Sequence, residues 1–432
     1  MPSAVFRGRS SACRCRGGWR EACSLFVRAR GGETRIEKEE TRMASSTKQL
    51  LFLPGPVTVA EPVLTAMSRP LVDHRGPEFK RTLERMSSRL RPIFGTRHEI
   101  LLLGASGTGG LEAGVANLFE PGDKVLAAPV GVFGNRLVAI AKMWGADVEV
   151  LETKWGRGVD HRALGERLRA DENCEIKGIL LTHNETSTGV ANEMHALATA
   201  IGKHPGLVVV DSVSGMGATP FMMDDWGFDV VVAASQKAFA APPGIAMVAV
   251  SDRAWEKMEK TRSSRFYFDL RRAREFAKIG QTPWTPPIST VFALERALDL
   301  YEREGDKKVH ARLTLNAHAI HAAMTAIGLR LFSQPPYHSN TVVAIHCPER
   351  VDANAVLQTC RDQGFVLSGG QQQLKGKIFR IGTMGDITRD NILAMLASFE
   401  DGVDRQGFAV DLGSGVGAAR EAFKAGLHPV AF

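Results

Sequence analysis

The stretch that decides the fold is "DVVVAASQKAFAAPPG", from Asp229 to Gly244. It opens with a short run of Val and Ala without polar and apolar alternation, which is typical of a strand buried on both faces of a sheet. Lys237 follows directly, although lysine is among the residues least often buried. The amino group at the end of this strand therefore either reaches out to solvent or has a chemical role.

Similar apolar runs occur repeatedly between residues 99 and 251. Short, Val/Ile/Leu-rich and bounded by turn residues, they read "EILLLGA", "DKVLAAP", "DVEVLE", "KGILLTHNE", "LVVVDSV", "DVVVAAS" and "GIAMVAVS". Segments with helical periodicity separate most of them, which favours an α/β layer architecture. The pattern predicts a large domain over residues 45–305, with a mostly parallel seven-stranded sheet between helices and an N-terminal arm at 45–60.

The pattern of apolar and polar residues changes after residue 285. Two long amphipathic helices are expected at 289–305 and 310–328. Shorter strand-like and helix-like segments then alternate, and they read "NTVVAIHCP", "ANAVLQTCRDQG", "FVLSGG", "KIFRIGT" and "TRDNILAMLASFEDGV". This organisation predicts a smaller α+β domain over residues 306–432.

Composition excludes several classes of protein. Of the 432 residues, 44% are hydrophobic and 23% charged, which is ordinary for a globular chain. No apolar stretch is long enough to cross a membrane. The net charge of +7 lies mostly in residues 1–42, which hold ten Lys and Arg against five Glu. The nearly neutral remainder speaks against a nucleic-acid or membrane partner.

The N-terminal segment, residues 1–44, is treated as an extension outside the fold. It is Arg-rich and resembles an organelle transit peptide, or it precedes a working start at Met43. The six cysteines show no CxxC pair or metal spacing, so we expect a reducing, cytoplasmic setting unless the extension is a transit peptide. His310, His318 and His321 are read as helix-surface residues, and no metal is expected.

Ligands of open α/β sheets bind beyond the carboxyl ends of the strands. After the first strand comes "GASGTGGLEAG", whose glycines open a helix and could hold a phosphate group, or could form a tight turn only. Asp211 ends the strand "LVVVD", where a carboxylate needs a cation or strong donors unless it caps a helix. Lys237 ends the next strand, where partial desolvation would favour the nucleophilic free amine.

One cofactor needs these three features together. Pyridoxal 5'-phosphate requires a lysine for its aldehyde, a carboxylate beside its ring nitrogen and an anion cup for its phosphate. An aromatic residue that stacks on the ring is also expected, and Phe133 in "APVGVFGNR" follows another strand. The residues therefore predict a pyridoxal-phosphate enzyme.

Several motifs are specific in combination, and they extend the prediction from about residue 50 to about residue 420. They read "LPGPVTV", "DHRGPEF", "GASGTGGLEA", "LTHNETSTGV", "VVVDSVSGMGATP", "SQKAFAAPPG", "QTPWTPP" and "KIFRIGTMGD". With these motifs the chain resembles the class V aminotransferases of fold type I, in particular the alanine/serine–glyoxylate aminotransferase group.

The resemblance implies a role for each matching residue. Lys237 would bond the cofactor aldehyde and act as base and acid, and Asp211 would pair with the pyridine nitrogen. The other cofactor-binding positions are Ser106, Gly107, Thr108, Phe133, Thr186, Gln236, Thr282 and Thr285. The last two reach the phosphate from the other subunit in the family, so a homodimer with shared active sites is implied. This chain has Thr282 where close relatives have Tyr.

Substrate binding is implied at two further places. Arg380 in "FRIGTMGD" matches the arginine that binds the substrate α-carboxylate, for which its planar fork is suited. The alternative is an arginine on the surface of an edge strand. Gly55 and Pro56 in "LPGPV" match a segment that approaches the substrate, and the alternative is a Pro/Gly turn without contact.

The expected activity is transfer of an amino group from a small amino acid, alanine or serine, to glyoxylate or pyruvate by a ping-pong mechanism. The alternatives are transamination of 2-aminoethylphosphonate with pyruvate, or of aspartate or ureidoglycine with glyoxylate. Cysteine desulfuration would need a cysteine on a flexible loop, but Cys347 lies in a strand-like run and Cys360 in a helix-like one. No physical argument from the residues decides the side-chain specificity.

Overall fold

A seven-stranded sheet lies at the centre of the computed structural model, which describes residues 49–426. Its order is β2-β10-β9-β8-β5-β3-β4, and within it only β10 runs antiparallel to its neighbours. The strands are β2 (Ile100–Gly104), β3 (Lys124–Ala127), β4 (Asp147–Val150), β5 (Ile176–Thr182), β8 (Leu207–Asp211), β9 (Val230–Ala234) and β10 (Ile245–Val250). Each coincides with one of the seven apolar runs, so the predicted fold class is confirmed.

Both faces of this sheet are covered, as the uninterrupted apolar runs require. Successive side chains point to opposite faces, so Val208 and Val210 belong to one hydrophobic core and Val209 to the other. Among the helices that bury side chains in the first core are α3 (Pro77–Phe94), α6 (His161–Arg169), α7 (Met194–Ile201) and α10 (Ile288–Glu304). Those in the second core are α4 (Gly107–Leu118), α5 (Val132–Met143), α8 (Asp252–Lys260) and α9 (Leu270–Lys278).

Helix α4 packs unusually close to the sheet because glycines line its inner side. A Cβ on Gly110 would lie 2.7 Å from Cγ1 of Val232, and one on Gly107 would lie 2.7 Å from Cγ2 of Val213. Such distances are incompatible with any side chain at these positions unless the sheet moves. The close packing places the start of α4 beside the carboxyl ends of β8 and β9.

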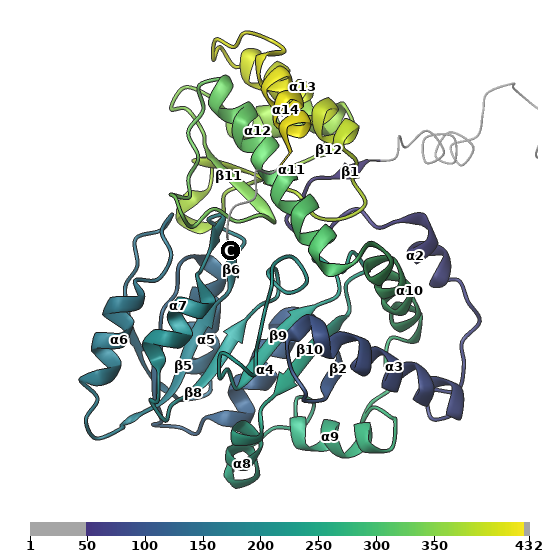
Figure 1. Ribbon diagram of the computed structural model, residues 1–432, viewed down its shortest axis with the longest axis vertical. Coiled ribbons are helices and arrows are strands. Elements are labelled where there is room, and N and C mark those ends of the chain that lie inside the picture. The colour runs from purple at the N-terminus through teal and green to yellow at the C-terminus, as the bar shows by residue number, and fades with distance from the viewer. Residues whose placement is uncertain (1–48, 427–432) are drawn as a thin grey trace, which may run out of the picture. The chain divides into compact units, whose positions relative to one another are not determined.

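The C-terminal elements have a hydrophobic core of their own, and Figure 1 shows them in green and yellow at one end of the molecule. A three-stranded antiparallel sheet in the order β11-β14-β13 packs with helices there. The elements are α11 (Asp306–Ala326), β11 (Val342–His346), α12 (Ala353–Asp362), β12 (Phe365–Val366), β13 (Ser368–Gly369), a 3-10 turn (Gln372–Leu374), β14 (Ile378–Gly382), α13 (Arg389–Asp404) and α14 (Ser414–Ala425). Sequence reasoning did not anticipate α14, and the boundary near residue 305 stays a proposal.

The N-terminal arm joins the C-terminal elements, although it precedes the large sheet in sequence. Strand β1 (Leu50–Leu51) pairs with β12, and the Gly382 amide of β14 donates to the Phe52 carbonyl over 2.7 Å. The arm then leads into α2 (Glu61–Ala66). It therefore connects β12 and the end of β14 to the large domain. The predicted extension over residues 1–44 lies outside the described residues.

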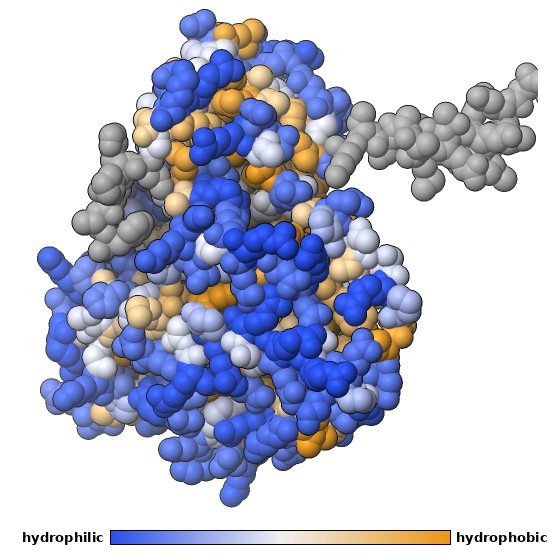
Figure 2. Space-filling view, turned by 45° about the vertical axis from the view of Figure 1, so that its right-hand side comes forward, coloured by the Kyte–Doolittle hydropathy of each residue, from blue (hydrophilic) through white to orange (hydrophobic). Residues whose placement is uncertain are grey.

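The face of the molecule seen in Figure 2 is mainly polar. In the view of Figure 2, hydrophilic residues cover most of the face and apolar residues form small patches. Among residues 49–426, no helix is both long and apolar enough to span a bilayer.

Candidate active site

Lys237 lies just past the end of β9 and does not reach solvent, since only 7% of its surface is exposed. Its Nζ donates a hydrogen bond to the Pro54 carbonyl over 2.7 Å. Burial disfavours the charged amine and lowers the pKa of Lys237 to about 8, although the nearby Asp211 carboxylate opposes the shift. The strand end thus carries an amine that loses its proton more readily than an ordinary lysine.

Asp211, the last residue of β8, is equally buried. Its Oδ1 accepts a hydrogen bond from the Val213 amide over 3.0 Å, which holds the turn after the strand. Burial raises the pKa of Asp211 to about 7, and the neighbouring Glu185 charge acts in the same direction. A buried acid and a buried base therefore end two adjacent parallel strands.

A cavity of about 280 Å³ opens between these two side chains. Ten of the predicted site residues line it, namely Gly55, Pro56, Ser106, Gly107, Thr108, Phe133, Thr186, Asp211, Gln236 and Lys237. They come from the arm, the start of α4, the start of α5 and the ends of three strands. The fold therefore brings together residues that are up to 182 positions apart in the sequence.

Three features of the cavity fit a phosphate-bearing, amine-reactive cofactor. No side chain caps the start of α4, so its first-turn amides are suited to an anion. The side-chain Oε1 of Gln236 is buried without a hydrogen-bond partner, and the same amide turned over would present a donor. Gly55 leaves space beside the amine, because a Cβ there would lie 2.6 Å from Lys237 Nζ.

The aromatic wall of the cavity includes a cation that sequence reasoning missed. The Arg136 guanidinium lies 4.6 Å from the centroid of the Phe133 ring, and its Nη1 donates to Thr108 Oγ1 over 3.1 Å. Phe133 and Arg136 are three positions apart on α5 and therefore share a face of the helix. The spacing of Phe133 and Arg136 in "GVFGNR" is the sequence signal from which Arg136 could have been predicted as a cavity residue.

Arg380 lies on β14 and is 4% exposed, so the alternative of a surface arginine is wrong. Its Nε donates to the Gly369 carbonyl over 2.8 Å, and its Nη1 donates to the Thr186 carbonyl over 3.2 Å. Burial lowers the pKa of Arg380 to about 10, an effect that Glu185 opposes. The Thr186 contact brings the guanidinium to the edge of the cavity from the C-terminal sheet.

A polar network that the sequence did not reveal supports Thr186. The Thr186 hydroxyl donates to Ser214 Oγ over 2.9 Å, and the Asn184 amide donates to the same oxygen over 2.8 Å. Asn184 also donates to Thr341 Oγ1 over 2.9 Å. Asn184 and Ser214 both line the cavity, so the network connects the cofactor side to the segment before β11.

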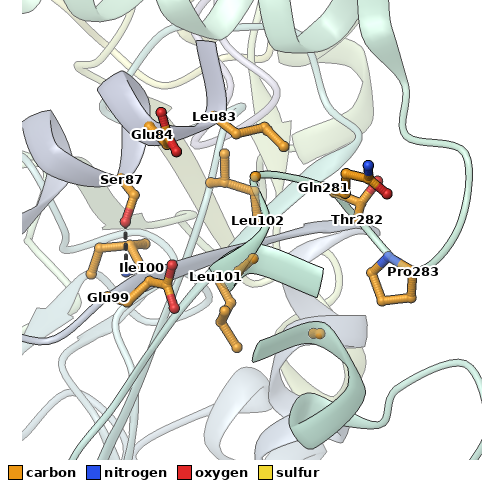
Figure 3. A pocket seen from close by; sticks show the side chains of 13 residues that line it. Leu83, Glu84, Ser87, Glu99, Ile100, Leu101, Leu102, Gln281, Thr282 and Pro283 are labelled. Carbon is orange, nitrogen blue, oxygen red and sulfur yellow. Dashed lines mark hydrogen bonds between the residues drawn. The ribbon is translucent and has the colours of Figure 1, made fainter. Parts of the chain in front are cut away.

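Thr282 and Thr285 do not line the cavity of their own chain. Thr282 lies in a separate pocket of about 40 Å³, which Figure 3 shows with Ser87 and Glu99 on the side opposite Thr282. Thr285 lines another small pocket, with Trp284. The two threonines are therefore placed apart from Lys237 within one chain, and their reach into a partner's site stays a prediction.

Across residues 49–426, no cluster of three or more His, Cys, Asp or Glu residues could hold a metal ion.

Comparison with known proteins defines the class. Residues 64–392 match the family described as aminotransferase class-V. The chain is 38% identical over 380 residues to the L-aspartate–glyoxylate aminotransferase of Paracoccus denitrificans, covering 87% of this chain and 96% of that protein. It is 36% identical to the serine–glyoxylate aminotransferase of Arabidopsis thaliana, covering 85% of this chain and 94% of that protein.

Solved structures agree with the sequence matches. The ureidoglycine–glyoxylate aminotransferase of Bacillus subtilis superposes with a TM-score of 0.82 at 28% identity, covering 88% of this chain and 99% of that one. The fold is thus that of the fold type I pyridoxal-phosphate enzymes. The chain belongs to the class-V aminotransferases, a family that uses pyridoxal phosphate and acts on amino acids and oxo acids.

Proposed function

We propose that this protein is a pyridoxal-phosphate-dependent aminotransferase that transfers the amino group of a small amino acid, alanine or serine, to glyoxylate or pyruvate. The observation that supports it best is the buried Lys237 amine, which faces a cavity shared with the Asp211 carboxylate. Burying an amine is costly for folding even when it donates a hydrogen bond, as Lys237 does to the Pro54 carbonyl, so a chemical role accounts for it better than a structural one.

The residues that would hold the cofactor are those of the cavity. The amides at the start of α4, with Ser106 and Thr108, would bind the phosphate, and Phe133 would cover one face of the ring. Asp211 would accept a hydrogen bond from the ring nitrogen and keep it protonated. When bound, pyridoxal phosphate supplies an aldehyde that reacts with amines and a ring that withdraws electrons from the substrate α-carbon.

Lys237 would carry the proton during the reaction. With a pKa of about 8, roughly one tenth of the free amine is unprotonated at pH 7 and can remove the α-proton. Arg380 would hold the substrate carboxylate with its planar guanidinium and so orient the α-carbon toward the amine. The same groups would serve the second oxo acid in reverse order, which gives ping-pong kinetics.

The donor and the acceptor are tested by a panel of substrates. Relatives of this chain are named for aspartate and for serine as donors, and both names include glyoxylate. Purified protein with pyridoxal phosphate should transaminate glyoxylate or pyruvate with alanine or serine faster than with aspartate or 2-aminoethylphosphonate. Activity with aspartate alone would show that the amino donor is aspartate and not alanine or serine. Turnover that persists unchanged in Lys237→Ala would refute the proposed function itself.

Cysteine desulfuration receives no support from the site. Cys174, Cys347 and Cys360, the cysteines within the described residues, do not line the Lys237 cavity. Burial raises the pKa of Cys347 and raises that of Cys360 to about 11, so neither thiol is activated.

We also propose a homodimer in which Thr282 and Thr285 complete the partner's phosphate site. Their placement outside the cavity of their own chain supports this arrangement. Thr285→Ala should then weaken cofactor binding in a dimer whose sedimentation is unchanged. A monomeric wild-type protein with full activity would contradict the proposal.

A further inference from the structure

A carboxylate that lines no part of the cavity lies directly behind it. Glu185 belongs to β6 (Asn184–Glu185), a short strand paired with β7 (Val190–Ala191), and none of its surface is exposed. Its Oε1 accepts from the amide and the hydroxyl of Ser187, over 3.0 and 2.7 Å. Its Oε2 accepts from the Phe133 and Gly134 amides, over 3.0 and 2.9 Å. Four donors thus satisfy one buried carboxylate.

These contacts cap the start of α5. The first amides of a helix have no partner inside the helix, and the N-cap residue Gly131 has no side chain with which to accept from them. Ser187 Oγ accepts from the Val132 amide over 2.9 Å, and Glu185 accepts from the next two amides. A distant segment therefore performs the capping. The positive end of the helix dipole also favours a carboxylate at this place.

The start of α5 and the segment 185–187 are in close contact. A Cβ on Gly131 would lie 2.5 Å from Glu185 Cγ and 2.5 Å from Ser187 Oγ. Moving or shortening the Glu185 side chain must therefore shift the first turn of α5 or leave buried amides without acceptors, which costs free energy in either case.

The first turn of α5 carries two residues of the cavity wall. The Phe133 ring and the Arg136 guanidinium both line the cavity, and Arg136 reaches Thr108 at the start of α4. The position of this turn sets where the aromatic face lies relative to Lys237. Burial lowers the pKa of Lys237 and of Arg380, and Glu185 opposes both shifts.

We propose that Glu185 is a positioning residue that holds the first turn of α5, and with it the Phe133 ring, against the bound cofactor. The inference rests on the proposed function, because it takes Phe133 as the side chain that contacts the cofactor ring. A cap that served folding alone would affect the stability of the protein without acting through Phe133.

The test is a double-mutant cycle read out as cofactor affinity. Pyridoxal phosphate is titrated into cofactor-free wild type, Glu185→Ala, Phe133→Ala and the double variant, and binding is followed by visible absorbance and visible circular dichroism. We expect each single variant to bind about tenfold more weakly, in line with the loss of buried charged hydrogen bonds or of an aromatic contact. If Glu185 acts through Phe133, the double variant loses far less than the product of the two.

Two further variants separate geometry from charge. Glu185→Gln can keep its oxygen toward the two α5 amides, but its NH₂ group would then face the Ser187 amide, which is also a donor. Its affinity should therefore fall below that of wild type but stay well above that of Glu185→Ala. Should Glu185→Ala fail to fold, Ser187→Ala removes the acceptor of the Val132 amide and one of the four donors to Glu185, and its smaller loss should show the same coupling to Phe133.

The matched control is Asp229→Ala, at the opposite end of β9. Asp229 is also a buried carboxylate that accepts from a backbone amide, that of Val208, over 2.9 Å. This variant should unfold more easily but bind the cofactor as wild type does. Multiplicative losses in the cycle, or unchanged affinity in Glu185→Ala, would overturn the role of Glu185. Wild type that neither binds pyridoxal phosphate nor transaminates would instead refute the proposed function.

Discussion

Asp211→Asn should stabilise the cofactor-free protein, and the gain should depend on pH. Burial raises the pKa of Asp211 to about 7, whereas the unfolded chain has the ordinary value of 3.8. Between these values the folded state binds the proton more tightly than the unfolded state does. The contribution of Asp211 to stability is therefore complete below pH 4 and is lost as the pH rises through 7.

The size of the effect follows from the two pKa values. About three pH units separate them, and each corresponds to 1.36 kcal/mol, so ionised Asp211 costs on the order of 4 kcal/mol at pH 8. Asparagine removes the charge and keeps an oxygen that can accept from the Val213 amide. Asp211→Asn should thus gain up to about 4 kcal/mol at pH 8 and almost nothing at pH 4.

Urea unfolding of cofactor-free wild type and Asp211→Asn at pH 4, 6 and 8 measures the difference. The two curves should converge toward low pH. A difference that is constant from pH 4 to pH 8, or a variant that is less stable at pH 8, would refute the argument from burial. The same variant should bind pyridoxal phosphate more weakly, because the ring nitrogen loses its anionic partner, so stability and function are opposed at this residue.

Three further predictions concern single residues. Arg380→Ala should raise KM for amino and oxo acids together by about 100-fold or more, in line with the loss of a buried charged hydrogen bond, and unchanged KM values in steady-state kinetics would exclude the clamp. Gly55→Ala should slow cofactor loading, followed by absorbance, because its Cβ would lie 2.6 Å from Lys237 Nζ at a φ of +132°; unaltered loading would contradict this. Gly110→Ala should lower the free energy of unfolding by about 1–2 kcal/mol, because its Cβ would overpack against β9. The control Gly417→Ala on α14, where a Cβ meets nothing within 4 Å, should raise the free energy of unfolding slightly. Equal effects of the two substitutions would refute the packing argument.

Local pattern sufficed for the central sheet and for two site residues. The seven apolar runs are the seven strands because residues buried on both faces leave no polar alternation in the sequence. Asp211 and Lys237 could be paired without a structure, since the ends of consecutive parallel strands meet at one edge of a sheet. The motifs then supplied the family, which the comparisons confirm, and the cofactor is the one expected for that family.

The arrangement around that pair was decided by contacts between distant segments. Arg380 on β14 donates to the carbonyl of Thr186, a residue of the cavity wall 194 positions earlier in the chain. The Pro54 carbonyl meets Lys237 only because the arm pairs with the C-terminal strands. Glu185 caps α5 although no local signal links "HNETSTG" to "GVFGNR".

The physical reason for this division is the range of the forces involved. Whether a segment forms a buried strand depends mainly on residues that are neighbours in the chain. The amino-acid sequence by itself therefore determined the strands, their ends and the residues Asp211 and Lys237. Long-range packing selects which buried donors meet which acceptors. Only the tertiary structure therefore decided that Arg136 lines the cavity and that Arg380 and Glu185 contact residues of its wall.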